Sequence, residues 1–138
     1  MITYEKVLVL KNVALFEKAS ELALSDLISV AEEEMLKAGE TLLESDQENR
    51  FLYVVLSGLL EMQENKTPIQ EFGPRQIIGE TTVFSPAPLP GIITAKKKTI
   101  LLRISADQLY RIMALHPTLA FSFLEELSRR VRLNEKKD

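Results

Sequence analysis

The residues of this sequence best suited to hold a small molecule lie in one stretch, IIGETTVFSPAPLPGIITA, at positions 77–95. Gly79 and Glu80 lead into residues that could form a single helical turn, and three prolines and Gly91 follow. A glycine-led turn of this kind can bring backbone N–H groups close to a small anion. Between Gly79 and Ala95, however, there is no Lys and no Arg, so the stretch suggests an anion site without its usual cation.

Two threonines, Thr81 and Thr82, follow the Gly-Glu pair. Their hydroxyl and N–H groups could contact a ligand, although threonines at such positions more often cap a turn or end a strand. Both interpretations are open at this point.

The composition excludes several kinds of chemistry. The 138 residues contain no Cys and a single His, His116, which excludes thiolate catalysis and any metal site built from Cys or from several His. The formal net charge of -3 gives the whole molecule no electrostatic attraction to DNA or RNA. No apolar run approaches about 18 residues, so we expect no transmembrane segment, and the lack of Cys fits a cytoplasmic location. We expect neither an enzyme nor a cofactor, because the enzymatic alternative, a cupin-like metal enzyme, would have to bind its metal through carboxylates alone.

The N-terminal residues favour helices. Residues 3–12 predict a short helix with Thr3 as its N-cap. Residues 20–34 predict a second helix, which Ser20 caps and whose apolar residues fall on one broad face. The acidic run Glu32-Glu33-Glu34 is then expected to be the solvated end of this helix.

From residue 35 to residue 104 the pattern indicates strands. Short apolar runs are separated by turn dipeptides at a spacing of roughly 8–12 residues, which is typical of a small antiparallel barrel or sandwich. FLYVVL at 51–56 is the clearest strand, and 92–95 and 99–104 predict two more. Lys96, Lys97 and Lys98 lie between these two strands, where a solvated hairpin turn is a simpler interpretation than a contact with nucleic acid or anionic lipid.

Residues 105–138 again favour helices. Ser105-Ala106-Asp107-Gln108 fits a capping box, and Pro117 suits the first position of the last helix. His116 is expected to cap this junction, with a pH-sensing or ligand-binding role as the alternative. In the last helix an apolar stripe could pair with a second copy or fold back on the protein itself; it consists of Leu119, Phe123, Leu127 and Val131.

This order of elements, with Gly39-Glu40, Leu52-Tyr53 and Gly58 at their spacing, resembles the cyclic nucleotide-binding domain family. That family comprises the β-roll of catabolite-activator-type transcription factors, of the regulatory subunit of the cAMP-dependent kinase and of gated channels. The resemblance covers nearly the whole chain and implies one mostly β domain. It would have a jelly-roll-like β-roll at 35–104, N-terminal helices at 1–34 and two C-terminal helices at 105–138. In the family, ligand binding repositions the last helix.

The stretch described first falls on the family's phosphate-binding cassette, approximately F-G-E-L-A-L-L-x-x-x-P-R-A-A-T, which aligns without a gap over residues 78–92. Gly79 matches the cassette glycine, Glu80 matches the glutamate that binds the ribose 2′-hydroxyl, and Pro88 matches the proline. The residues alone favour the simpler interpretation, in which Gly79 permits a tight turn and Glu80 caps a helix. The resemblance implies a ligand pocket made by Gly79, Glu80, Thr81, Thr82, Leu89, Pro90, Gly91 and Ile92.

Two departures from the family pattern affect the anion site. The cassette arginine falls on Leu89 and the following alanine on Pro90, which removes a cation and a backbone N–H. Ile92 takes a position where the family often carries a hydroxyl residue, so it indicates a drier pocket or is simply core. The nearest candidates for a replacement cation are Lys96, Lys97 and Lys98, at the far turn of the strand.

We therefore expect a regulatory or sensor module of this fold that responds very weakly, or not at all, to cAMP and cGMP. The alternative is a working sensor that binds a cyclic nucleotide weakly or takes a different, less anionic ligand in the same pocket. Too few residues follow Pro117 for a helix-turn-helix, so we expect no DNA-binding domain in this chain. The expected partners are other domains of a longer protein, or a second copy bound through the last helix.

Overall fold

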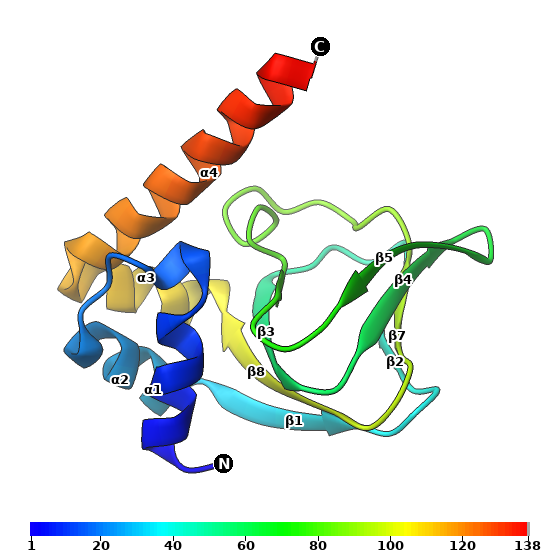
Figure 1. Ribbon diagram of the computed structural model, residues 1–138, viewed down its shortest axis with the longest axis horizontal. Coiled ribbons are helices and arrows are strands. Elements are labelled where there is room, and N and C mark those ends of the chain that lie inside the picture. The colour runs from blue at the N-terminus through cyan, green and yellow to red at the C-terminus, as the bar shows by residue number, and fades with distance from the viewer. Residues whose placement is uncertain (138) are drawn as a thin grey trace. The chain divides into compact units, whose positions relative to one another are not determined.

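The computed structural model describes the backbone of residues 1–137 and the side chains of residues 1–135 (Figure 1). The chain forms two compact units. The β unit is Ala31–Ala106, and the helical unit joins Met1–Val30 to the residues from Asp107 onward.

The β unit consists of two four-stranded sheets in which every strand pair is antiparallel. The first sheet has the strand order β1-β8-β3-β6, and the second has the order β2-β7-β4-β5 (Figure 1). The strands are β1 (Glu32–Leu36), β2 (Thr41–Leu43), β3 (Phe51–Ser57), β4 (Leu60–Glu64), β5 (Thr67–Phe72), β6 (Ile77–Ile78), β7 (Ile92–Ala95) and β8 (Thr99–Ser105). The expected β-roll, including the three strands predicted most clearly, is therefore confirmed.

Alternate residues of these strands build one hydrophobic cluster from both sheets, here called the β core cluster. Tyr53 and Val55 enter it from β3, and Leu60 and Met62 enter it from β4, because side chains two residues apart share a face of a strand. Its other members are Leu36, Leu43, Phe72, Ile78, Ile93, Ala95 and Leu101. Burial raises the pKa of the Tyr53 hydroxyl to about 12, with a further rise from the Glu34 carboxylate that Arg103 partly offsets.

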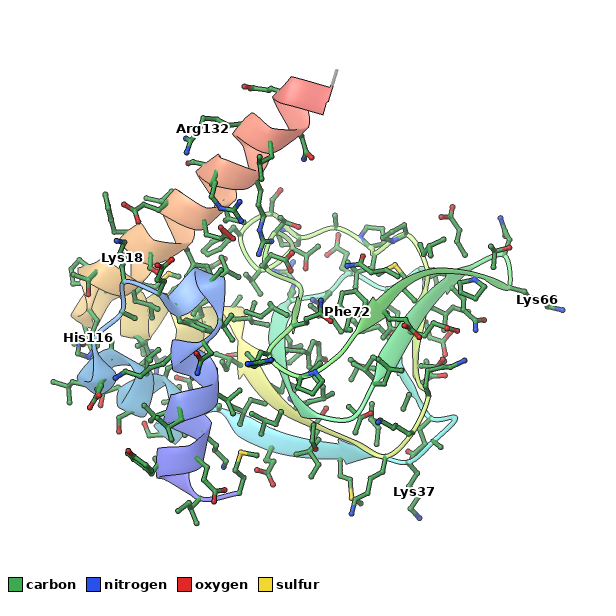
Figure 2. The ribbon with its side chains drawn as sticks, in the orientation of Figure 1. Lys18, Lys37, Lys66, Phe72, His116 and Arg132 are labelled. Atoms are coloured by element: carbon green, nitrogen blue, oxygen red, sulfur yellow. The ribbon has the colours of Figure 1, made fainter. Side chains whose placement is uncertain are left out.

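Two hairpin turns show why the strands change direction where they do. Gly58 joins β3 to β4 with a φ of +101°, and a Cβ there would lie 2.5 Å from the backbone of Thr99. Asn65 and Lys66, with φ of 52° and 64°, form the tip of the β4–β5 hairpin, where Figure 2 labels Lys66. Positive φ at both central residues is the geometry that fits the twist of a two-residue hairpin.

The acidic run is a strand and not a helix end, so the prediction of a helix to Glu34 is wrong. The second helix ends at Val30, and β1 begins at Glu32 and pairs with β8. Glu32 and Glu34 share one face of β1, where both form ion pairs with Arg103 of β8, the second at 3.0 Å between Arg103 Nη1 and Glu34 Oε1. Glutamate favours helices locally, but strand pairing and these ion pairs override that preference.

The helical unit contains α1 (Thr3–Lys11), the 3₁₀ turn η1 (Ala14–Phe16), α2 (Glu21–Val30), α3 (Ala106–Leu115) and α4 (Pro117–Lys137). The predicted cap at Ser20 is confirmed, because its Oγ accepts a hydrogen bond from the Ala23 N–H at 3.1 Å. The predicted cap at Thr3 is wrong. Thr3 is already helical, and Ile2, whose side chain cannot accept a hydrogen bond, takes the N-cap position.

Part of the predicted α4 stripe packs inside the helical unit. Leu119 and Phe123 are fully buried, and the Phe123 ring meets the ring of Phe16 edge-on with 5.4 Å between the ring centroids. Val131, in contrast, is 56% exposed. None of the described helices is long and apolar enough to cross a lipid bilayer.

Candidate functional site

The loop between β6 and β7, residues 79–91, is here called the cassette segment. It opens at Gly79 with a φ of +90°, in the left-handed region that favours glycine. A Cβ at Gly79 would also collide with Asn49 Nδ2 and the carbonyl oxygen of Phe51. Both conformation and space therefore demand glycine at this position.

Past Gly79 the chain makes a hydrogen-bonded turn over residues 80–84. The N–H of Val83 donates to the Gly79 carbonyl at 3.1 Å, and the N–H of Ser85 donates to the Thr81 carbonyl at 3.1 Å. These two N–H groups are thus bonded within the segment. The single helical turn that the sequence suggested is present only as this turn and is not continued as a helix.

Thr82 serves the structure of the segment. Its side chain is buried, and its Oγ1 accepts a hydrogen bond from Asn49 Nδ2 at 3.1 Å. The same hydroxyl donates a hydrogen bond to the Gly79 carbonyl at 3.4 Å. Thr81 is exposed. Of the two hydroxyls considered as ligand contacts, that of Thr82 is therefore engaged inside the protein.

Asn49 is the residue that holds the segment, and the sequence analysis did not identify it. It is 2% exposed, its Nδ2 also donates to the Phe51 carbonyl at 2.7 Å, and its Oδ1 accepts the Phe51 N–H at 3.1 Å. Its own N–H donates to the carbonyl of Ala87 at 3.5 Å, and the adjacent Glu48 forms a β-bridge with Pro88. Asn49 thus links the start and the end of the cassette segment to the start of β3. An Asn in a polar cluster before a strand usually signals only a turn, so the sequence carried no distinctive sign of this role.

Leu89, at the position of the family's arginine, contacts the hydrophobic interior. Its half-buried side chain packs against the β core cluster. Pro90 follows on the surface, and Gly91 is buried so tightly that a Cβ would collide with the Gln63 carbonyl of β4. This end of the segment is therefore fixed by apolar packing and close backbone approach.

A cavity of about 220 Å³ lies beside the cassette segment. Ile69, Gln70 and Phe72 of β5 line one part of it, and Figure 2 labels Phe72 where β5 ends. The remaining lining residues are Met62, Ile77, Ile78, Gly79, Glu80, Thr81, Leu89 and Pro90. Among these described side chains Glu80 is the one carboxylate, and none is Lys or Arg.

The eight predicted pocket residues do not all face this cavity. Pro90, Gly91 and Ile92 line a separate hollow of about 370 Å³ beside the tip of the β4–β5 hairpin. The expectation that Ile92 is core is wrong, because Ile92 is 38% exposed whereas its neighbour Ile93 is fully buried. The alternation of a strand turns the two side chains to opposite faces. Five predicted residues thus line the first cavity and three line the second, with Pro90 common to both, and Thr82 lies in the interior.

The lysine run occupies the turn between β7 and β8, as predicted. Lys96 Nζ lies 3.5 Å from Glu61 Oε2 of β4, and Glu61 is itself buried at 4% exposure. Gln63 Nε2 donates to the other oxygen of the same carboxylate at 2.6 Å. Lys96 is therefore placed to compensate a buried acid of the sheet.

In the helical unit, one polar cluster lies at the start of α4 and another near its middle. The carbonyl of His116 accepts the Leu119 N–H at 2.9 Å, a main-chain bond that does not depend on the histidine side chain, and its Nε2 lies 2.7 Å from Asp26 Oδ2. Farther along α4, Glu126 is 7% exposed and accepts hydrogen bonds from Arg129 Nε at 2.6 Å and Arg130 Nε at 3.3 Å. The Arg129 hydrogen bond is the main cause that lowers the pKa of the Glu126 carboxyl, against the opposing effect of burial.

The fold matches solved structures closely. The N-terminal domain of a transcriptional regulator from Streptomyces coelicolor A3(2) is 25% identical, with a TM-score of 0.85 over 94% of each chain. The sensor domain of the transcriptional regulator DNR from Pseudomonas aeruginosa is 19% identical, with a TM-score of 0.80 over 99% of this chain and 97% of that one. The catabolite activator protein of Thermus thermophilus is 18% identical, with a TM-score of 0.78 over 90% of this chain and 61% of that one. The last two likenesses are evidence for the fold alone.

Sequence comparison finds a relative and a family match. The Pycsar effector protein BcPycTIR of Burkholderia cepacia is 28% identical over 115 residues, which are 82% of this chain and 36% of that protein, so the chain spans about a third of the relative's length. Residues 33–116 match the family described as cyclic nucleotide-binding domain, and this match takes in both sheets, the cassette segment and α3. The chain belongs to the cyclic nucleotide-binding domain family.

Proposed function

We propose that this chain is a regulatory or sensor module that responds very weakly, or not at all, to cAMP and cGMP. The observation that carries the proposal is the packing of Leu89, which lies against the β core cluster at the position of the family's arginine. The family is regulatory in general, and we infer that this member performs no catalysis of its own and needs no cofactor.

The energetic cost of the two departures supports weak binding. Leu89 supplies neither charge nor donor, and Pro90 has no N–H to give. Charge-assisted hydrogen bonds contribute about 1.5–3 kcal/mol each, so losing two of them costs roughly 3–6 kcal/mol, or about two to four decades in affinity.

Titration of the unmodified protein with cAMP or cGMP, followed by calorimetry and by thermal unfolding, tests the proposal. A ligand at about a hundred times its Kd would stabilise the protein by about 2.7 kcal/mol, which raises Tm by several degrees. We expect no such shift at millimolar nucleotide. Tight binding of either nucleotide would overturn the proposal.

The double variant Leu89→Arg with Pro90→Ala should recover part of the response, because it restores the guanidinium and the N–H. We expect a gain in affinity on the order of tenfold to a hundredfold, measured by calorimetry. The matched control Leu89→Gln with Pro90→Ala restores the N–H without the charge and should gain much less. If the arginine variant folds normally but gains no affinity for either nucleotide, the alignment of the cassette is wrong.

We also propose that the chain works as one module of a longer protein, or pairs with a second copy of itself through α4. The relative's greater length supports the first part. For the second, Phe121, Leu124 and Val131 fall on one face of α4 and are 58%, 62% and 56% exposed. Leu124→Glu should abolish the dimer in sedimentation equilibrium, whereas Leu115→Glu, at an equally exposed residue of α3, should leave it intact. A monomeric unmodified protein would refute the dimer.

A further inference from the structure

We propose that the cavity beside the cassette segment binds a small, mostly apolar molecule that is neutral or cationic, and that it rejects anions of the same size. The inference rests on the proposed function in one respect, namely that the cassette segment still borders a ligand site. It goes further by assigning the charge, polarity and size of the ligand.

The lining gives the polarity. Most of the cavity wall is hydrocarbon, from Met62, Ile69, Phe72, Ile77 and Leu89 among others. Ile69 is 47% exposed on an edge strand, so it presents apolar surface to solvent where a ligand could cover it. A hydrophobic wall with a few polar groups is the usual make-up of a small-molecule site. Here those polar groups are Glu80, Thr81 and Gln70.

The charged residues around the cavity indicate the charge of the ligand. Glu80 is the acidic group of the lining, and the described lining side chains include no Lys or Arg. Two basic groups of the same unit are paired elsewhere, Lys96 with Glu61 and Arg103 with Glu32 and Glu34. An anion that entered the cavity would lose hydration without gaining a counter-charge, and burying an uncompensated charge is costly. A hydroxyl or ammonium group meets the opposite situation, because the carboxylate and the Gln70 and Thr81 oxygens are acceptors.

The volume gives the size. Typical sites for drug-sized ligands measure about 300–1,000 Å³, whereas this cavity measures about 220 Å³. The ligand it fits best is therefore a molecule of one or two rings, smaller than a nucleotide.

Three probes of nearly equal size and different charge test the inference: benzyl alcohol, benzylamine and benzoate. Each is titrated into the whole chain, and the ¹³C-methyl resonances of its Ile, Leu and Met residues are followed by NMR. We expect the alcohol and the amine to shift the methyl signals of Met62, Ile69, Ile77 and Leu89. Benzoate should bind weaker by on the order of tenfold or more, because its charge is not compensated.

Two variants identify the site and its selectivity. Leu89→Arg should reverse the order, so that benzoate binds best. Ile69→Ser, a change at an exposed and therefore tolerant position, should weaken the alcohol severalfold without unfolding the protein. The control Ile92→Ser alters the separate hollow and should change none of the three titrations.

Equal binding of all three probes, shifts confined to the methyl groups of Ile92, or no shift with any probe would each overturn the inference. These outcomes are distinct from failure of the proposed function. Tight cAMP binding in calorimetry refutes that function. If neither cAMP nor any of the three probes binds detectably, only the ligand class assigned here is refuted.

Discussion

The β unit holds its cassette segment with a buried neutral amide, whereas in the helical unit a buried carboxylate of α4 pairs with two arginines of the same helix. Asn49 is satisfied by Phe51 and Thr82, all within a neutral hydrogen-bond network. Glu126 is satisfied by the guanidinium groups of Arg129 and Arg130. Both arrangements leave a buried polar side chain paired, but only the second depends on ionisation.

This difference explains how the cassette segment can keep its form without an anion. Its start is fixed by Asn49, Thr82 and the conformation of Gly79, and its end by the packing of Leu89. None of these interactions requires a ligand or a cation. The stability of the segment should therefore be indifferent to pH, while that of α4 should decline in acid, where Glu126 becomes protonated.

Gly79→Ala is expected to have the largest effect on the free energy of unfolding, about 3 kcal/mol or more, because a left-handed φ and a steric clash combine there. Gly39→Ala is the matched control. Gly39 has the same φ of +90° but nothing within 4 Å of its Cβ position, so it should cost only about 1–2 kcal/mol. Urea unfolding of both variants measures the difference. Equal losses would mean that the contact with Asn49 and Phe51 carries no weight.

Asn49→Ala comes next, with an expected loss of about 2–3 kcal/mol, because it leaves the buried Thr82 hydroxyl and the Phe51 backbone groups without this partner. The loss should be the same at about pH 5 and pH 8, since no group in this network changes charge in that range. Gln47→Ala, an exposed neighbour in the same loop, should have almost no effect. Hydrogen exchange should locate the loosening at residues 79–88, and a uniform increase over the chain would contradict the role of Asn49 as an anchor.

Glu126→Gln should have the smallest effect, about 1 kcal/mol, because its two arginine partners are partly exposed to solvent. The Glu126 pKa is lowered by folding, so its contribution is present above the ordinary Glu pKa of about 4.3 and is lost as the pH falls through the lower folded value. The unmodified protein and the variant should therefore converge in stability at low pH in a series of urea titrations. Glu125→Gln, at an exposed residue of the same helix, should show neither the loss nor the convergence.

The sequence was informative where local pattern and tertiary structure agree. The FLYVVL strand, the turn at Gly58 and the break at Pro117 follow from β propensity, from backbone conformation and from the missing N–H of proline. It was misleading at Glu32–Glu34, where helix-favouring residues form a strand because they pair with β8, some seventy residues away, whose Arg103 meets two of them. Contacts of such separation leave no mark in a local window.

The candidate site could be predicted only in part for the same reason. Gly79 and Leu89 were identifiable by alignment to the family pattern, and both lie at the cavity. Asn49, Ile69 and Phe72 reach the cassette or its cavity from other elements, and only the folded chain brings them there. Ile92 was misplaced because a one-residue difference along β7 separates the interior from the surface.

The buried hydroxyl of Tyr53 makes alkaline solution a probe of the β core. The folded protein holds this phenol neutral up to a pKa of about 12, whereas an unfolded tyrosine ionises near its ordinary value of about 10. The contribution of Tyr53 to the free energy of unfolding is therefore fully present below about pH 10 and declines as the pH rises toward the pKa of the folded state. Because the chain contains no Trp, the ultraviolet absorbance of phenolate is not overlaid by indole. A late absorbance step that coincides with loss of circular dichroism would thus mark the opening of the roll itself.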